Sequence, residues 1–172
     1  MSKKLYIAYG SNLNLKQMAQ RCPTAVLVGT GVVNGYELQF KGVPDNAFAT
    51  IGEKEGASVP VAVWELEPRD EMRLNVYEGY PTHYFKKNIS VTMNGKEISG
   101  MAYIMNLQAE FNMPSFSYLK VIRDGYKDCS LDLKALQRAF DETEARLLEQ
   151  SESDEDFGED EDEDLSFDSM QM

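Results

Sequence analysis

The sequence contains very little histidine or cysteine, the side chains that most often bind zinc or take part in nucleophilic catalysis. Its 172 residues include one histidine, His83, and two cysteines, Cys22 and Cys129. One imidazole excludes any site that needs two, and we expect a structural or surface role for His83. Two cysteines form at most one bridge, and their spacing indicates neither a disulfide framework nor a metal site. We therefore expect reduced thiols, as in a cytoplasmic protein, and no bound metal.

Long apolar runs are also absent. The longest fall far short of the roughly 20 residues that a membrane-spanning helix needs. The apolar stretch at residues 5–9 is shorter than the about 7–15 residues of a signal peptide and is typical of a strand. We expect no membrane association and a cytoplasmic location.

The chain has no excess of basic residues, since its formal net charge is -12. Residues 151–172 carry 11 of the 29 acidic side chains, which leaves 18 acids against 17 lysines and arginines in residues 1–150. A nearly neutral remainder offers no basic face for phosphates, so we expect no nucleic-acid partner.

Glycine-rich nucleotide motifs are missing as well. Gly29-Thr30-Gly31 lacks the third glycine and the strand-to-helix setting of a dinucleotide motif. The acidic residues near the C-terminus lack the glycine turn and spaced ligands of a calcium loop. Chemistry without a cofactor is what these absences leave.

The acidic residues 151–172 have too few apolar groups to offset the entropy cost of ordering them. We therefore expect one domain over residues 1–150 and a disordered acidic tail over residues 151–172. Two interpretations of the tail remain open: a segment that binds a protein partner, or a solubilising extension.

Apolar and β-branched runs of strand length dominate the first 105 residues. They predict strands at 4–9, 25–33, 36–41, 47–52, 60–66, 84–93 and 97–105. Asn34-Gly35 and Asn94-Gly95 each lie between two such runs, and Asn-Gly favours the positive φ angles of a type I′ hairpin turn. We expect antiparallel pairing with tight turns at both places.

Helix signals separate these strands. Pro68 suits the first position of a helix that runs to Val76, and Ser115 is placed to cap a helix over 116–127. The spacing of apolar residues predicts further helices over 14–21 and 131–150. This mixture fits an α+β domain with a closed or nearly closed antiparallel sheet.

The segment Tyr9-Gly10-Ser11-Asn12-Leu13 lies where the first expected strand ends and a helix is about to begin. Backbone N–H groups converge at such a turn, and the helix N-terminus adds positive potential. The loop is therefore a candidate for binding a carboxylate or an oxyanion, although glycine, serine and asparagine are also ordinary turn residues.

Glu78 lies between an expected helix and an expected strand, with Tyr77, Tyr80 and Tyr84 close in sequence. Apolar surroundings would raise the pKa of this carboxyl group toward neutrality. Such a group exchanges protons at cellular pH, as a general acid or base must. Glu78 is thus a candidate catalytic residue, the alternative being a plain surface carboxylate.

Three elements, in this order, resemble the gamma-glutamylcyclotransferase-like superfamily, including its AIG2-like members. The run from Tyr9 to Leu13 is similar to the family's Tyr-Gly-Ser-Asn-Leu signature. Glu78-Gly79 with Tyr84 resembles the segment around the family's catalytic glutamate. Pro114-Ser115-Phe116-Ser117-Tyr118, followed by Gly125, resembles a third run of many members. The resemblance covers most of residues 4–145.

This resemblance implies a small mixed, mainly antiparallel β-barrel with flanking helices, and an enzyme that needs no cofactor or metal. Glu78 would act as general acid/base while a γ-glutamyl group closes into 5-oxoproline and an amine leaves. The residues implied in substrate binding are Tyr6, Tyr9, Gly10, Ser11, Asn12, Leu13, Tyr84 and Tyr118.

The leading interpretation is a cyclotransferase acting on small γ-glutamyl amino acids or peptides. One alternative is an enzyme for γ-glutamyl amines, such as a modified lysine side chain. Another is a non-catalytic binding module of the same fold that binds a protein partner through its tail. The intact signature and Glu78 argue against the binding module.

Overall fold

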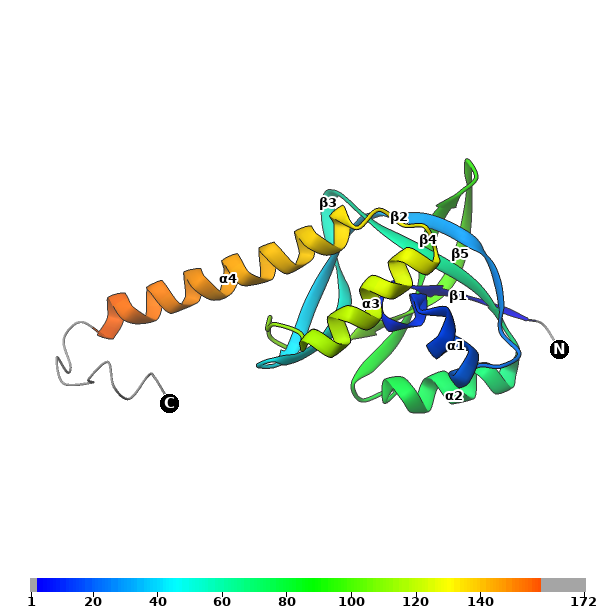
Figure 1. Ribbon diagram of the computed structural model, residues 1–172, viewed down its shortest axis with the longest axis horizontal. Coiled ribbons are helices and arrows are strands. Elements are labelled where there is room, and N and C mark those ends of the chain that lie inside the picture. Colours follow the sequence, from blue (N-terminus) through cyan, green and yellow to red (C-terminus); the bar gives the residue numbers. More distant parts are fainter. Residues whose placement is uncertain (1–2, 159–172) are drawn as a thin grey trace.

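The β-branched and apolar segments between residues 4 and 105 form five strands that close into a barrel (Figure 1). The computed structural model describes residues 3–158. The strands are β1 (Lys4–Ala8), β2 (Val26–Val43), β3 (Asn46–Leu66), β4 (Tyr84–Met93) and β5 (Lys96–Met105). The helices are η1 (Ser11–Leu13, a 3-10 helix), α1 (Leu15–Arg21), α2 (Pro68–Glu78), α3 (Phe116–Asp128) and α4 (Lys134–Gly158).

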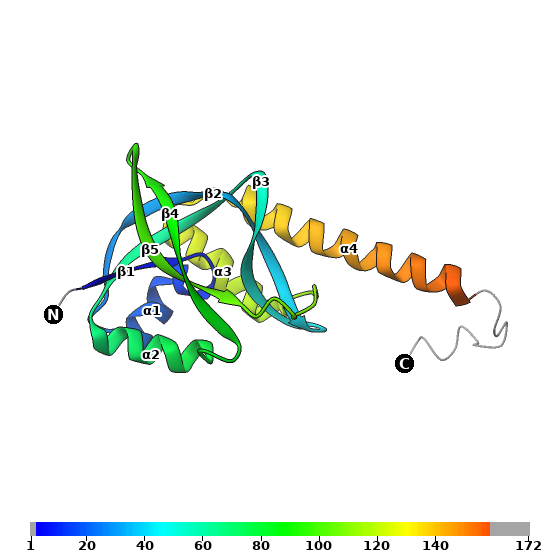
Figure 2. The same cartoon turned by 180° about the vertical axis from the view of Figure 1, so that it is seen from behind.

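The strands follow the order β1-β3-β2-β4-β5 around the barrel. Every neighbouring pair is antiparallel except β1 and β5, which are parallel where Tyr6 lies opposite Met101. Seen from behind, the long β4–β5 hairpin projects above the barrel (Figure 2). The predicted α+β class with a mixed, mainly antiparallel barrel is confirmed.

The two Asn-Gly pairs behave differently. Asn94 and Gly95 form the predicted tight turn between β4 and β5, with φ angles of 53° and 77°. Asn34 and Gly35 do not form a turn between strands, so the tight turn predicted at this pair is wrong. They lie inside β2, where pairing with β3 is irregular between Asn34 and Tyr36.

The long strand β2 continues past this irregularity and reverses only at Pro44 and Asp45, with Val43 opposite Asn46. Asp45 supplies the positive φ of the reversal, 58°. The predicted strands 25–33 and 36–41 are therefore one strand, and 47–52 and 60–66 are also one strand.

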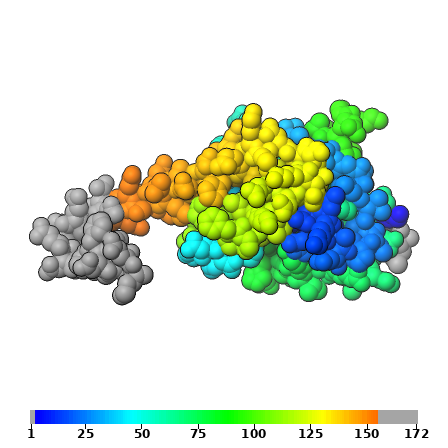
Figure 3. Space-filling model, viewed as in Figure 1, coloured from blue at the N-terminus to red at the C-terminus, as the bar shows by residue number. Residues whose placement is uncertain are grey.

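Helix α4 begins on the barrel and then leaves it (Figure 3). Leu136, Ala139 and Thr143 are buried, whereas residues 148–154 are exposed. The helix continues past Ser151, where the sequence predicts the start of a disordered tail, because the segment before it is rich in strong helix formers. The rest of that tail, residues 159–172, lies outside the described residues. Within residues 3–158 no helix is long and apolar enough to cross a bilayer.

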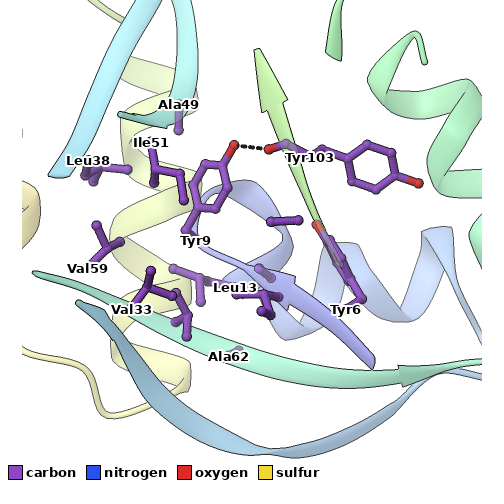
Figure 4. Packing of buried hydrophobic residues seen from close by; sticks show 14 of the residues in the cluster. Tyr6, Tyr9, Leu13, Val33, Leu38, Ala49, Ile51, Val59, Ala62 and Tyr103 are labelled. Atoms are coloured by element: carbon purple, nitrogen blue, oxygen red, sulfur yellow. Dashed lines mark hydrogen bonds between the residues drawn. The ribbon is translucent and has the colours of Figure 1, made fainter. Parts of the chain in front are cut away.

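Aliphatic side chains of β2 and β3 pack around the chain segment that follows β1 (Figure 4). Tyr9 and Leu13 lie among Val33, Ile51 and Val59, all of them buried. Full burial of one such aliphatic side chain stabilises a fold by about 1.5–3 kcal/mol. The core therefore holds the segment from Tyr9 to Leu13 at a fixed place on the barrel.

Candidate active site

A cavity of about 930 Å³ opens where η1, the C-terminal end of α2, the β2–β3 hairpin and the loop after β5 meet. Most of the predicted site residues line this cavity: Tyr6, Tyr9, Gly10, Ser11, Asn12, Glu78, Tyr84 and Tyr118. Leu13 does not line it, since its side chain is fully buried in the core. The structure thus brings together residues that are far apart in the sequence.

The segment after β1 turns through η1, in which the N–H of Leu13 donates to the Gly10 carbonyl at 3.0 Å. Asn14 then caps α1, because its Oδ1 accepts from the N–H of Gln17 at 3.1 Å. Helix α3 packs directly on this backbone at Gly125, where an added Cβ would lie 2.7 Å from the Asn14 nitrogen. Glycine at this position lets α3 approach closely enough to support the loop.

Two tyrosines bind the same backbone unit of β3 beside the loop. The hydroxyl of Tyr84 donates to the Ala49 carbonyl at 3.0 Å, and the hydroxyl of Tyr118 accepts from the Ala49 N–H at 3.0 Å. A Cβ at Gly10 would lie 3.2 Å from the Ala49 Cβ, so the loop backbone is close to this unit. Because Tyr118 accepts from Ala49, its own hydroxyl proton is free to donate to a ligand.

Tyr6 and Tyr9 anchor the other side of the loop. The Asn12 side-chain amide donates to the Tyr6 hydroxyl at 2.8 Å, and the Tyr9 hydroxyl donates to the Tyr103 carbonyl (Figure 4). Burial raises the pKa of Tyr6, Tyr9, Tyr84 and Tyr118. These hydroxyls therefore keep their protons at neutral pH and serve as hydrogen-bond donors.

Glu78 is the last residue of α2, and the turn after it brings the half-buried side chain to the cavity. Gly79 adopts the left-handed conformation, with a φ of 65°, and its N–H donates to the carbonyls of Asn75 and Val76. Within residues 3–158 no hydrogen bond or ion pair reaches the Glu78 carboxyl group. Burial raises the pKa of Glu78 to about 7, against the opposing effect of the Arg21 charge.

Arg21 is a residue that the sequence reasoning missed. Its guanidinium lies 3.7 Å above the Tyr77 ring and donates to Asn12 Oδ1 at 2.7 Å and to Ser11 Oγ at 3.3 Å. Arg21 thus connects the loop to the residue that precedes Glu78. No local pattern marks it, because an arginine in the last turn of a helix is ordinary.

The remaining candidates show no sign of metal or thiolate chemistry in the described part of the chain. No group of three or more histidine, cysteine, aspartate or glutamate side chains gathers there. Cys22 and Cys129 are free and buried. Burial raises the pKa of Cys22 to about 11, so the group is a thiol at neutral pH. His83 lines the cavity but is exposed.

Comparison with known proteins identifies the family of this chain. Residues 6–120 match the family described as gamma-glutamyl cyclotransferase, AIG2-like. The chain belongs to this family. A gamma-glutamylcyclotransferase from Bos taurus is 34% identical over 140 residues, which cover 76% of this chain and 73% of that protein. One from Homo sapiens is 31% identical over 139 residues, with the same two shares of 76% and 73%.

Solved structures agree with the family assignment. A gamma-glutamyl cyclotransferase superposes with a TM-score of 0.74 at 28% identity, covering 80% of this chain and 86% of that one. A yeast gamma-glutamyl cyclotransferase specific to glutathione has a TM-score of 0.60 at 12% identity, covering 83% and 96%, and shares the fold alone. The predicted family and the predicted enzyme class, a cyclotransferase, are therefore confirmed.

Proposed function

We propose that this enzyme converts a γ-glutamyl amino acid, peptide or amine into 5-oxoproline and a free amine, with Glu78 as general acid and base. The observation that carries the proposal is the position of Glu78. Its carboxyl group has no partner within residues 3–158, its pKa is raised to about 7, and it lines the same cavity as residues Tyr9–Asn12. A group with this pKa is present in both protonation states near neutral pH.

The reaction needs only the movement of protons within one substrate molecule. The substrate's α-amine attacks its own γ-carbonyl carbon while the Glu78 carboxylate takes a proton from the attacking nitrogen. The bond between the γ-carbon and the leaving nitrogen then breaks as Glu78 returns that proton to the leaving nitrogen. No water is consumed. The attack is intramolecular, and an enzyme that holds the amine against the carbonyl removes much of the remaining entropic barrier.

The cavity offers hydrogen-bond donors for the charges of this substrate and of its tetrahedral intermediate. The hydroxyl protons of Tyr6 and Tyr118 have no acceptor in residues 3–158. Ser11 and Asn12 open η1, so their N–H groups have no partner inside that helix. We assign these donors to the α-carboxylate of the glutamyl group and to the oxyanion that forms on the γ-carbonyl.

The proposal is tested by incubating the purified protein with γ-glutamyl amino acids, γ-glutamyl dipeptides and γ-glutamyl amines. The expected products are 5-oxoproline and the free amine in equal amounts. Free glutamate in place of 5-oxoproline would make the protein a hydrolase and would contradict the cyclisation. Glu78→Gln should lose this activity. Glu97→Gln is its matched control, because Glu97 is an exposed carboxylate on β5 that does not line the cavity.

A further inference from the structure

The cavity is lined by a second charged residue besides Glu78. Among the lysine, arginine, aspartate and glutamate residues of the described chain, only Glu78 and Lys41 line it. Glu78 lies at the end of α2, whereas Lys41 lies on β2, close to the reversal into β3. One cavity therefore presents a carboxyl group and an ammonium group from different elements.

Lys41 is held in place without a carboxylate of its own. The side chain is half-buried, and its Nζ lies 4.7 Å from the centre of the Phe111 ring. Arg146 of α4 lies on the same ring, 4.2 Å from its centre, and is paired with Glu37. Within residues 3–158 no acidic group forms an ion pair with Lys41. Burial, followed by the Arg146 charge, lowers the pKa of Lys41, and Glu37 opposes this shift.

The β2–β3 ladder shows how Lys41 is placed relative to the tyrosines. Lys41 pairs with Phe48, and the Phe48 ring packs edge-on against Tyr118 at 5.1 Å between centres. The next residue is Ala49, whose backbone carbonyl and N–H form the hydrogen bonds with Tyr84 and Tyr118. The pair Lys41–Phe48 therefore lies one residue further along the ladder than the pair Phe40–Ala49, a rise of about 3.3 Å along each strand.

We propose that Lys41 binds a carboxylate of the leaving group, so that the enzyme prefers γ-glutamyl amino acids and peptides to γ-glutamyl amines. This inference rests on the proposed function. The glutamyl α-carboxylate shares a carbon with the α-amine, which must reach Glu78. Ser11 lies close to that residue, because its Oγ is 3.3 Å from the hydroxyl of Tyr77, which precedes Glu78. Lys41 lies instead beside Phe111 and opposite Phe48, so its charge matches the substrate's other carboxylate, on the departing amino acid.

The test compares two substrates that differ only in this carboxylate: γ-glutamyl-alanine and γ-glutamyl-ethylamine. A charge-assisted hydrogen bond stabilises by about 1.5–3 kcal/mol, and each 1.4 kcal/mol is tenfold. We expect Lys41→Met to lower kcat/KM for γ-glutamyl-alanine by about 10- to 100-fold, mainly through KM. Turnover of γ-glutamyl-ethylamine should stay within a few-fold of wild type.

Two further variants control for structure. Lys41→Arg keeps the charge and should restore most of the selectivity for γ-glutamyl-alanine. Lys54→Met removes a lysine that pairs with Glu37 at 3.2 Å on the same hairpin but does not line the cavity, and selectivity should not change. If Lys41→Met does not fold, as judged by thermal melting, Lys41→Gln replaces it.

Equal losses on both substrates, or an unchanged ratio between them, would overturn the role of Lys41 while leaving the cyclotransferase activity in place. A wild-type enzyme that prefers γ-glutamyl-ethylamine would overturn it as well. If the wild type releases 5-oxoproline from neither substrate nor from any other γ-glutamyl compound, the proposed function itself fails, and the role of Lys41 falls with it.

Discussion

Glu37 and Glu78 are both partly withdrawn from solvent, but the two carboxyl groups differ in their neighbours and in their acidity. Glu37 accepts from Gln39 at 2.9 Å and from Arg146 at 3.0 Å, and Lys54 lies 3.2 Å from its other oxygen. Burial acts to raise the pKa of Glu37, but these three partners outweigh burial and lower it. Glu78 has no such partner in residues 3–158, and burial raises its pKa to about 7.

The comparison separates a structural carboxylate from one that is free to exchange protons. Glu37 connects β2 to α4 through Arg146 and is stabilised as an anion. Glu78 is withdrawn from water, but its oxygens accept no hydrogen bond from the described residues. The number of partners, more than the degree of burial, therefore decides which of the two carboxyl groups can take up and release a proton near neutral pH.

The largest effect on turnover is expected from replacing Glu78, the proposed proton-exchanging group. Glu78→Gln keeps the shape and polarity of the side chain but cannot carry a proton. General acid/base groups contribute about 10²–10⁴-fold in rate, so turnover should fall by at least 10²-fold with substrate affinity largely kept. Single-turnover assays and calorimetric binding measure the two quantities separately.

Glu37→Gln is the matched control for that loss, because it makes the same chemical change at the paired carboxylate. Its turnover should remain within a few-fold of wild type. The assignment would be wrong if Glu78→Gln kept near wild-type turnover while replacement of Glu37, Glu65 or Glu67 abolished it.

A second way to sharpen the comparison is to measure stability against pH. The folded pKa of Glu78 lies above the ordinary value of 4.5, so the folded state binds the proton more tightly than the unfolded state. The contribution of Glu78 to wild-type stability should therefore fall as pH rises from about 4.5 to about 7. Glu78→Gln lacks this loss and should gain relative to wild type by at most about 3 kcal/mol at pH 8. Urea denaturation at pH 4.5 and pH 8 checks it.

The opposite sign is expected at Glu37. Its folded pKa is lowered, so its contribution to stability is present above the unfolded pKa and is lost as pH falls through the folded pKa. Glu37→Gln leaves Arg146 and Lys54 without their anion and should lower the free energy of unfolding at pH 7 by about 1–2 kcal/mol. The same urea series measures it. A stabilising Glu37→Gln would remove the distinction between the two carboxyl groups.

Replacing Arg21 should have a smaller effect, a shift in the pKa of Glu78. Its positive charge opposes the rise of the Glu78 pKa. Arg21→Met should therefore raise that pKa further and move the acidic limb of the kcat/KM profile to higher pH. Arg21→Lys keeps the charge and should move the limb less. A limb that does not move, or that moves to lower pH, would contradict an electrostatic role for Arg21.

The smallest effect on stability and turnover is expected from a deletion at the C-terminal end of the sequence, away from Glu37 and Glu78. Deleting residues 151–172 removes a segment whose described side chains, those of residues 151–154, are exposed. The free energy of unfolding should change by less than about 0.5 kcal/mol, and turnover should stay near wild type. Thermal melting and the 5-oxoproline assay check both. A large loss of either would show that the acidic segment contributes to the folded enzyme.

The sequence predicts most of the barrel strands but not how far each one continues. Asn34-Gly35 and Asn94-Gly95 have the same local preference for a turn. At Asn94 the pairing of β4 with β5 agrees with that preference. At Asn34 it does not, because Tyr36–Val43 continues to pair with β3, and the chain accommodates the glycine as an irregularity with a φ of 81°. Long-range pairing decides between the two outcomes, and no local window of sequence contains it.

The candidate site residues were predictable where they stand in short sequence motifs. The segment Tyr9–Leu13 and Glu78 stand in recognisable runs, and the structure places all of them except the Leu13 side chain at one cavity. Arg21 and Lys41 stand in no such run. Their positions depend on tertiary contacts, the first with Tyr77 and the second with Phe111, so the sequence alone does not mark them.

The parallel pairing of β1 with β5 has a consequence for synthesis on the ribosome. β1 leaves the ribosome first, but the partner that closes the barrel on it ends at Met105, and α3, which supports the loop at Gly125, follows later still. A nascent chain that has emerged only as far as Leu66 exposes one edge of β1. Such an edge is a template for pairing with other chains. The fold is therefore of high contact order, and the candidate cavity is completed only after Tyr118 has emerged.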